Sequence, residues 1–414
     1  MLTELITRPE YRSRYWALPI LGTHIDAFST FLFKRGYHRM GVLRRIRGVP
    51  LVEKRLKRMG CRSDSDLLPD VLADCGPAVG KAHTDMSAGP TVRLLGQYFY
   101  EVGLFKIPPA GPIETKLLEY GEYLKSVRGF APSTAENHLM TSRDFLGKFC
   151  PEERLPLLRK LSHQDIESYV CDCGKRIGRG YLQHIVARLR GLLRYLASRG
   201  EVPLGLDLQI DTPRLYRGEK LPRSLPWNVV RKLLKSIDTS RPSGMRDYAM
   251  LCLVTTYGLR VSEVIDLKLE DLDWRKETIR VPQIKAATPL ILPLTQQVGN
   301  AILRYLKKGR PPSERREVFL RHRTPAGMLA RTAVSDAFRL WSRRSGLPIP
   351  FQGAHCLRHS YAVHLLREGT SIKTIGDVLG HRSLESTCVY LRLSIEDLRS
   401  VPLNLPSSAA GRRQ

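Results

Sequence analysis

The spacing of apolar residues predicts helices along most of this chain. Between residues 111 and 200, apolar side chains recur every three or four positions, which is the period of an amphipathic helix. The helices expected there are Glu114–Val127, one that begins at Ser133, Asp165–Val170 and Gly180–Arg199. Ser133 and Glu136 have the spacing of a capping box, which would fix the start of the second helix. We therefore predict a small all-α module over residues 111–200.

A second helical region follows residues 201–219, a stretch that prolines punctuate and that is expected to be a linker. The first helices beyond it are expected at Trp227–Ile237 and Met245–Tyr257. Gly258 should end the latter helix, because glycine adopts the left-handed conformation of a helix C-terminus without strain. Ser262 is expected to cap a short helix that begins at Glu263.

A β-rich piece interrupts the helices of this second region. Two strands are predicted at Thr278–Val281 and Leu290–Leu294, and the turn between them contains Lys285. The expected fold is therefore α+β, mainly α with a small antiparallel β-sheet. The predicted divisions are an N-terminal helical extension (1–107), the helical module (111–200), the linker (201–219), a second domain (220–403) and a mobile tail (404–414).

The charge of the chain points to a polyanionic partner. Lysine and arginine outnumber aspartate and glutamate by 67 to 40, giving a net charge of +27. Solubility of a small domain needs a charge of only about 2–8, so nucleic acid is the favoured partner. The arginines expected to point outward from the last helix of the module are Arg188, Arg190, Arg194 and Arg199. Such a face suits DNA phosphates, although a helical bundle with solvated arginines would have the same pattern.

The basic run Lys34–Arg58 in the N-terminal extension has two interpretations. It either follows a DNA backbone or forms a solvated helix face, and the sequence favours neither.

The cysteines and the apolar segments exclude several classes of protein. Cys171 and Cys173 lie near His163, but a full zinc-ligand set with the usual spacing is missing, so reduced structural thiols are expected. No apolar run approaches the roughly 18 residues of a membrane helix, and the N-terminus lacks the apolar segment of a signal peptide. We expect a cytoplasmic protein without a metal, a cofactor or a membrane span.

The stretch from His355 to Tyr390 holds side chains suited to phosphodiester chemistry. Cutting a phosphodiester without a metal requires a nucleophile, a balance for the charge of the five-coordinate phosphorus, and a proton for the leaving oxygen. The Tyr390 phenol is the candidate nucleophile. Arg260 and Arg358 are permanently charged planar groups that can bind the non-bridging phosphate oxygens.

Three further residues complete this candidate set. His355 lies one helical turn before Arg358 and is a plausible base or proton shuttle, because imidazole titrates near neutrality. His381 can bind a phosphate oxygen and help to seat the tyrosine. Lys285 can protonate the departing 5′ oxygen. Any one of these residues alone is more simply a surface cation or a core aromatic, and it is their ordered appearance that carries the hypothesis.

Three strings of the chain resemble the motif boxes of the tyrosine recombinase, or phage integrase, family. They are TYGLRVSEVIDL (256–267), HCLRHSYAVHLL (355–366) and LGHRSLESTCVYLR (379–392). The resemblance covers roughly residues 220–400, and the module at 111–200 is similar in pattern to that family's core-binding domain. The six functional positions of the family carry over to Arg260, Lys285, His355, Arg358, His381 and Tyr390. The family's turn usually reads Gly-Lys-Gly, so Ile284-Lys285-Ala286 departs from it.

This resemblance implies a site-specific recombinase or integrase of a mobile element, plasmid or phage. Tyr390 would form a covalent 3′-phosphotyrosyl bond to double-stranded DNA without ATP or a metal. The protein would clamp DNA in a C shape as a homo-tetramer on paired sites, or assemble with related recombinases, in the bacterial cytoplasm at the nucleoid. Residues 1–107 would then be an arm-type DNA-binding or protein-contact region. Two alternatives stay open: a catalytically silent accessory subunit, and a type IB-like topoisomerase.

Overall fold

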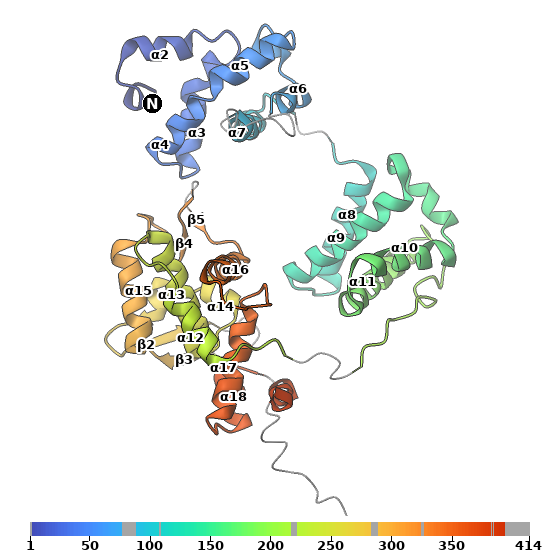
Figure 1. Cartoon of the computed structure of the whole chain (residues 1–414). Coiled ribbons are helices and arrows are strands. Elements are labelled where there is room, and N and C mark those ends of the chain that lie inside the picture. Colours follow the sequence, from blue (N-terminus) through green and yellow to red (C-terminus); the bar gives the residue numbers. More distant parts are fainter. Residues whose placement is uncertain are drawn as a thin grey trace, which may run out of the picture. The chain divides into compact units, whose positions relative to one another are not determined.

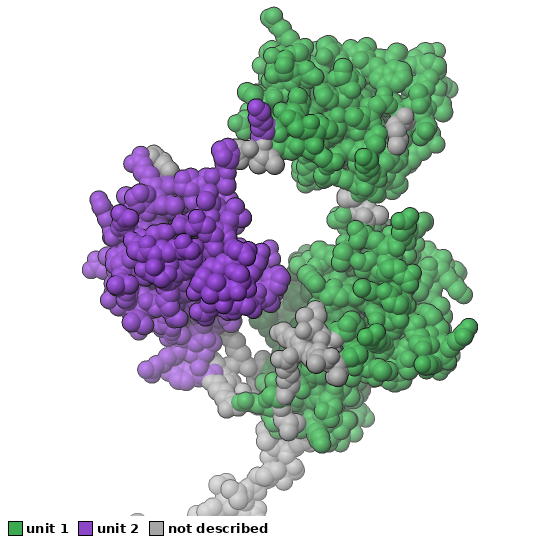
Figure 2. Space-filling model, turned by 180° about the vertical axis from the view of Figure 1, so that it is seen from behind, with its two compact units in different colours: residues 1–105, 220–414 green, residues 106–219 purple. Residues whose placement is uncertain are grey.

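The computed structural model describes residues 2–76, 88–106, 109–216, 222–282, 289–323, 327–381, 383 and 385–393. The chain divides into two compact units, one of Met1–Phe105 with Lys220–Gln414 and one of Lys106–Glu219 (Figure 2). Helices dominate both, and the strands are few, short and antiparallel (Figure 1). The predicted class, mainly α with a small antiparallel sheet, is confirmed. No described helix is long and apolar enough to cross a membrane.

The first hundred residues form a helical body with its own hydrophobic core. Its helices are α1 (Leu2–Leu5), α2 (Pro9–Trp16), α3 (Ile25–Lys34), α4 (Arg39–Ile46), α5 (Val49–Arg58), α6 (Pro69–Asp74) and α7 (Ala88–Glu101). The basic run of the sequence lies on α4 and α5. Glu53 of α5 is 2% exposed, and its two oxygens accept hydrogen bonds from the backbone N–H groups of Ile20 and Leu21. This buried carboxylate fixes α5 against the loop before α3.

The second unit is built from four long helices around a separate core. They are α8 (Pro112–Glu122), extended by a π-helical turn at Tyr123–Val127, α9 (Pro132–Phe149), α10 (His163–Arg176) and α11 (Arg179–Ala197). The predicted cap at Ser133 is wrong, because α9 begins one residue earlier, after Ala131, and has no side-chain cap. Pro132 holds the φ angle of a first helical turn by itself.

The arginines of α11 do not all point outward as predicted. Arg190, which is partly buried, donates to the carbonyl of Ile210. Arg194 is exposed as predicted and forms an ion pair of 2.7 Å with Asp207. Val202, Leu206 and Ile210 are buried in the same core, so the first half of the expected linker packs on the module. The reason is that this segment carries apolar residues between its prolines, and α11 supplies donors for its backbone.

Residues 222–393 contain the sheet and the remaining helices (Figure 1). The helices are α12 (Trp227–Lys235), α13 (Pro242–Tyr257), α14 (Val261–Ile265), α15 (Gln296–Lys308), α16 (Ala333–Ser345), α17 (His355–Arg367), α18 (Ile372–Leu379) and α19 (Glu385–Cys388). A sheet of order β1-β2-β3 is formed by Leu272–Asp273, Thr278–Val281 and Leu290–Pro293. The predicted turn with Lys285 lies outside the described residues. A second pair, β4 (Leu320–Arg321) with β5 (Gly327–Met328), was not predicted.

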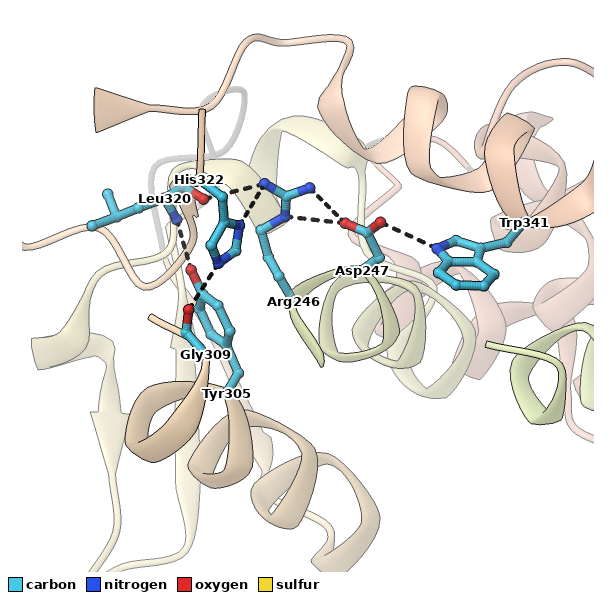
Figure 3. A network of polar contacts seen from close by, with 7 residues as sticks. All are labelled: Arg246, Asp247, Tyr305, Gly309, Leu320, His322 and Trp341. Atoms are coloured by element: carbon cyan, nitrogen blue, oxygen red, sulfur yellow. Dashed lines mark hydrogen bonds and ion pairs between the residues drawn. The ribbon is translucent and has the colours of Figure 1, made fainter. Parts of the chain in front are cut away.

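A buried polar network fixes the start of α13 (Figure 3). Asp247, which is 2% exposed, accepts hydrogen bonds from Arg246 (2.7 Å) and from the indole N–H of Trp341 in α16 (3.1 Å). Arg246 also donates to the Leu320 carbonyl and lies 3.2 Å from His322 Nδ1. Because arginine only donates, Nδ1 accepts, and His322 Nε2–H donates to Gly309. The network joins α13, α15, β4 and α16.

We expect Asp247→Ala to lower the free energy of unfolding of this part by about 3–5 kcal/mol, because it leaves a half-buried guanidinium without its carboxylate. Urea unfolding followed by tryptophan fluorescence measures the change. Arg331→Ala, which breaks the exposed 2.5 Å pair with Asp266, is the control and should cost about 0–1 kcal/mol. Equal losses in the two variants would contradict a supporting role for the network.

Candidate active site

The end of α13 is pressed against α17 and α18, and a glycine makes this possible. Gly258 ends the helix in the left-handed conformation, with φ of 64°. A Cβ at this position would lie 2.6 Å from Leu379 Cδ2 and 2.7 Å from Tyr361 Cδ1. Both the positive φ and the close approach require glycine. The Gly258 carbonyl is therefore held where it can accept a hydrogen bond from α17.

That hydrogen bond comes from Arg358, which is 3% exposed. Its Nη1 donates to the Gly258 carbonyl and its Nη2 to the Leu379 carbonyl, each at 2.6 Å. Burial, then the nearby Arg260, lower its pKa to about 10, so the group stays charged at neutral pH. Within the described part of the chain no carboxylate forms an ion pair with Arg358. Glu263 acts on Arg358 through its charge, but its carboxylate is hydrogen-bonded to Arg260. A buried cation whose own hydrogen bonds go to two carbonyls is suited to an anionic ligand.

Arg260 is held by a carboxylate and keeps an exposed edge. Glu263, 4% exposed, accepts from the Arg260 backbone N–H and from its Nη1, each at 2.7 Å. Arg260 Nη2 donates to the Gly380 carbonyl at 3.0 Å, and the side chain is 31% exposed. The predicted cap at Ser262 is wrong: α14 begins at Val261, and the carboxylate three residues after Arg260 satisfies its N-terminus instead.

Three histidines lie near the guanidinium of Arg358. His355 and His359 lie one turn apart on α17, with ring centroids 4.5 Å apart in an edge-to-face contact. His381 follows Gly380, which ends α18 with φ of 62°, and its Nδ1 lies 2.8 Å from the Thr387 hydroxyl. Burial, then His355, Arg358 and His381, lower the pKa of His359 to about 4. Burial, then Arg358, Arg260 and His355, lower the pKa of His381 to about 4. The side chain of His355 is partly exposed. Burial of the remainder, then Arg358 and Arg260, lower its pKa.

Tyr390 lies in the 3-10 turn Val389–Leu393 and is 2% exposed. Its phenolic oxygen lies 3.0 Å from His359 Nδ1, and its ring stacks on His381 with centroids 6.3 Å apart. Burial raises the pKa of Tyr390, while Arg358 and Arg260 act in the opposite direction. The phenol is therefore protonated at neutral pH and next to two guanidinium groups.

The structure brings together five of the six candidate residues, namely Arg260, His355, Arg358, His381 and Tyr390. Lys285 lies outside the described residues. Sequence reasoning missed His359 and Glu263. The signals were present, since His359 follows Arg358 directly and is four residues from His355, and Glu263 is three residues from Arg260.

No group of three or more histidine, cysteine, aspartate or glutamate side chains is placed to hold a metal among the residues that the structure describes. Cys171 and Cys173 lie on α10, the former exposed and the latter buried.

We expect the DNA-free protein to lose stability as pH falls from about 6.5 to about 4. The folded-state pKa values of His359 and His381 lie below the ordinary value of 6.5, so the unfolded chain binds more protons in this window. Each histidine then adds up to about 1.4 kcal/mol per pH unit to the slope of the free energy of unfolding against pH. Below about pH 4 the histidine is protonated in both states and adds no slope. Urea unfolding between pH 7 and 5, where carboxylates stay ionised, measures it. His381→Asn should flatten the slope, and an unchanged slope would contradict the assignment.

Three comparisons with known proteins show what this chain is similar to. Residues 223–396 match the model of the phage integrase family. Putative integrase/recombinase y4rA of Sinorhizobium fredii is 32% identical over 298 residues, which are 72% of each chain. Tyrosine recombinase XerD of Listeria monocytogenes serotype 4b is 34% identical over 221 residues, 52% of this chain and 72% of that one.

A solved structure shares the fold. The XerH site-specific recombinase bound to palindromic difH substrate, in a post-cleavage complex, matches 71% of this chain and 97% of its own at 18% identity, with a TM-score of 0.51. From the family match and the y4rA relative, the chain belongs to the phage integrase family, and it is a tyrosine recombinase, an enzyme that breaks and rejoins DNA strands.

Proposed function

We propose that this chain is a site-specific recombinase that cuts a DNA strand with Tyr390, holds it through a 3′-phosphotyrosyl bond and rejoins it to another 5′ hydroxyl. The observation that carries the proposal is the buried guanidinium of Arg358, which has no ion-pair partner in the described residues and faces the phenol of Tyr390. A phosphodiester is an anion that would fill this place, because arginine binds two oxygens of one phosphate at once.

The cleavage step assigns one task to each residue. The phenolic oxygen of Tyr390 bonds to phosphorus, and the bond from phosphorus to the 5′ oxygen breaks. Arg358 and Arg260 balance the charge that develops on the non-bridging oxygens. The hydrogen bonds to Gly258, Leu379 and Glu263 are formed before DNA arrives, so the guanidinium groups need little reorganisation during the reaction.

The remaining roles follow from the family resemblance and from the contacts of the imidazoles. His381 uses Nδ1 for Thr387, which leaves Nε2 to donate to a phosphate oxygen. His355 keeps an exposed edge beside both arginines, where it can bind the phosphate or relay a proton. Lys285 would protonate the leaving 5′ oxygen, on the resemblance alone.

The partner that fits this site is double-stranded DNA. The net charge of +27 supports it, since neutralising phosphates releases counterions. Arg44 of α4, Arg47 directly after that helix, and Lys54 and Arg58 of α5 are exposed and form no ion pair within the described part. We propose that this surface contacts DNA outside the cut site, as an arm-type reader, and that the module at 111–200 and the catalytic domain at 220–403 clamp the cut site.

Recombination of two sites needs more than one copy of the chain. A homo-tetramer on paired sites, or an assembly with related recombinases, would supply four nucleophiles for four strands. Integration, excision or transposition of a mobile element in the bacterial cytoplasm is the setting that we infer for this activity.

Tyr390→Phe should abolish the covalent protein–DNA adduct and leave DNA affinity within about threefold, because only the attacking oxygen is removed. The substrate is nicked duplex carrying the cut site, first mapped by trapping adducts of the unaltered protein on DNA that flanks its own coding sequence. Denaturing gels measure the adduct. An adduct that survives the substitution would remove Tyr390 from the mechanism.

Assays on DNA that carries the same mapped site also distinguish the two alternative functions. Plasmid relaxation without exchange between two sites would indicate a topoisomerase. Binding without any adduct would indicate an accessory subunit.

Glu263→Ala should slow adduct formation by roughly 10- to 100-fold, because Arg260 would lose the carboxylate that orients it. Glu263→Gln keeps one of the two acceptors, its amide oxygen, so it should retain more activity than alanine. Rates under single-turnover conditions, with DNA affinity measured in parallel, test this. Cleavage by the alanine variant at the unaltered rate would show that Glu263 does not position Arg260.

A further inference from the structure

His359 is the imidazole that touches the nucleophile. Its Nδ1 lies 3.0 Å from the Tyr390 oxygen, and among the described residues no other side chain is within hydrogen-bonding distance of that oxygen. His381 stacks on the tyrosine ring and commits its own Nδ1 to Thr387. His355 contacts the ring of His359 instead of the phenol.

The position of His359 is fixed by the helix that also carries Arg358. The next residue, Ser360, is 2% exposed; its hydroxyl donates to the Cys356 carbonyl and accepts from the backbone N–H of Leu225. The ring of His355 contacts the imidazole of His359 edge-to-face, with centroids 4.5 Å apart. Tyr390 is held in turn by a small core of Ala362, Val363, Ile375 and Leu379. Neither partner of the hydrogen bond is free to turn away.

The protonation states, together with the tautomer of His359, give this hydrogen bond a direction. Burial, then His355, Arg358 and His381, lower the pKa of His359 to about 4, and burial raises the pKa of Tyr390. At neutral pH the phenol is protonated and the imidazole is neutral; in the Nε2–H tautomer of His359 the phenolic O–H donates and Nδ1 accepts. The groups that face this pair are cationic or neutral: Arg260, Arg358, His355 and His381. A phosphodiester that binds to the arginines brings the negative charge that makes Nδ1 a better base.

We propose that His359 is a further catalytic residue, whose Nδ1 orients the phenolic hydrogen of Tyr390 and accepts that proton as the oxygen bonds to phosphorus. This inference rests on the proposed function of the same site. It assigns the proton of the nucleophile to His359, and it leaves His355 to position the His359 ring and the phosphate.

The step balances without any further reactant. As the bond from the phenolic oxygen to phosphorus forms, its proton moves to Nδ1 and the bond from phosphorus to the 5′ oxygen breaks. The leaving oxygen takes a proton from the donor proposed at Lys285. In rejoining, an incoming 5′ hydroxyl attacks phosphorus and gives up its proton to that amine, the phosphotyrosyl bond breaks, and Nδ1–H returns the proton to the phenolic oxygen.

The test compares single-turnover cleavage of the mapped site by the unaltered protein and by His359→Asn. Asparagine can accept the phenolic hydrogen bond at nearly the place of Nδ1 but cannot take up the proton. We expect cleavage to slow by at least 100-fold with DNA affinity unchanged. His364→Asn is the matched control, a histidine on the same helix that stacks on Trp227 with centroids 4.2 Å apart, and it should cleave like the unaltered protein.

Two further measurements separate proton acceptance from a purely structural role. A duplex with sulfur in place of the leaving 5′ oxygen needs no acid for departure, so it should restore a Lys285→Ala variant but not His359→Asn. Added imidazole should accelerate His359→Ala by at least tenfold, with a pH profile that follows the pKa of the added base. If His359→Ala does not fold, the sulfur substrate with His359→Asn decides by itself.

The outcomes distinguish this inference from the proposed function. His359→Asn that cleaves within threefold of the unaltered rate, or that the sulfur substrate restores, would overturn the role of His359 while leaving Tyr390 as the nucleophile. Absence of any adduct with the unaltered protein would overturn the proposed function itself.

Discussion

The site is organised by one buried cation. The guanidinium of Arg358 donates to the carbonyls of Gly258 and Leu379, which lie 100 and 21 residues away along the chain. These two bonds tie the end of α13 and the end of α18 to α17. They satisfy the geometry of the group but not its charge, because a carbonyl dipole offsets only part of a full positive charge.

An arginine lies at each end of α13, and the two arginines differ in how their charge is balanced. At the start of this helix Arg246 has Asp247 as its partner, and the pair is further bound by Trp341, so that the network is complete without a ligand (Figure 3). At the other end of the helix the guanidinium of Arg358 has no such carboxylate among the described residues. One arginine supports the fold, whereas the other leaves a positive charge for a phosphate to neutralise.

The same cation governs the titrating groups around it. Arg358 and Arg260 disfavour protonation of His355 and His381, and both favour ionisation of Tyr390 against the effect of burial. Without DNA the histidines are neutral and the phenol keeps its proton, bound to His359. On our proposal, a phosphodiester would bring negative charge to the arginines and so raise the pKa of His359, which becomes a better base for the phenolic proton when the substrate is in place.

The sequence by itself determined the helical character of the chain, the strands at Thr278–Val281 and near Leu290, and the set of side chains that meet at the site. These features depend on local periodicity and on residue type, which a linear pattern records. Only the tertiary structure decided which groups touch. His359 was overlooked because its partner is 31 residues away, and the packing of Val202, Leu206 and Ile210 turned half of a predicted linker into core. Ser262 was predicted as a cap because its type suits one, but the carboxylate of Glu263 was placed to satisfy Arg260. Such contacts depend on how helices pack, and that is settled by the burial of the whole core.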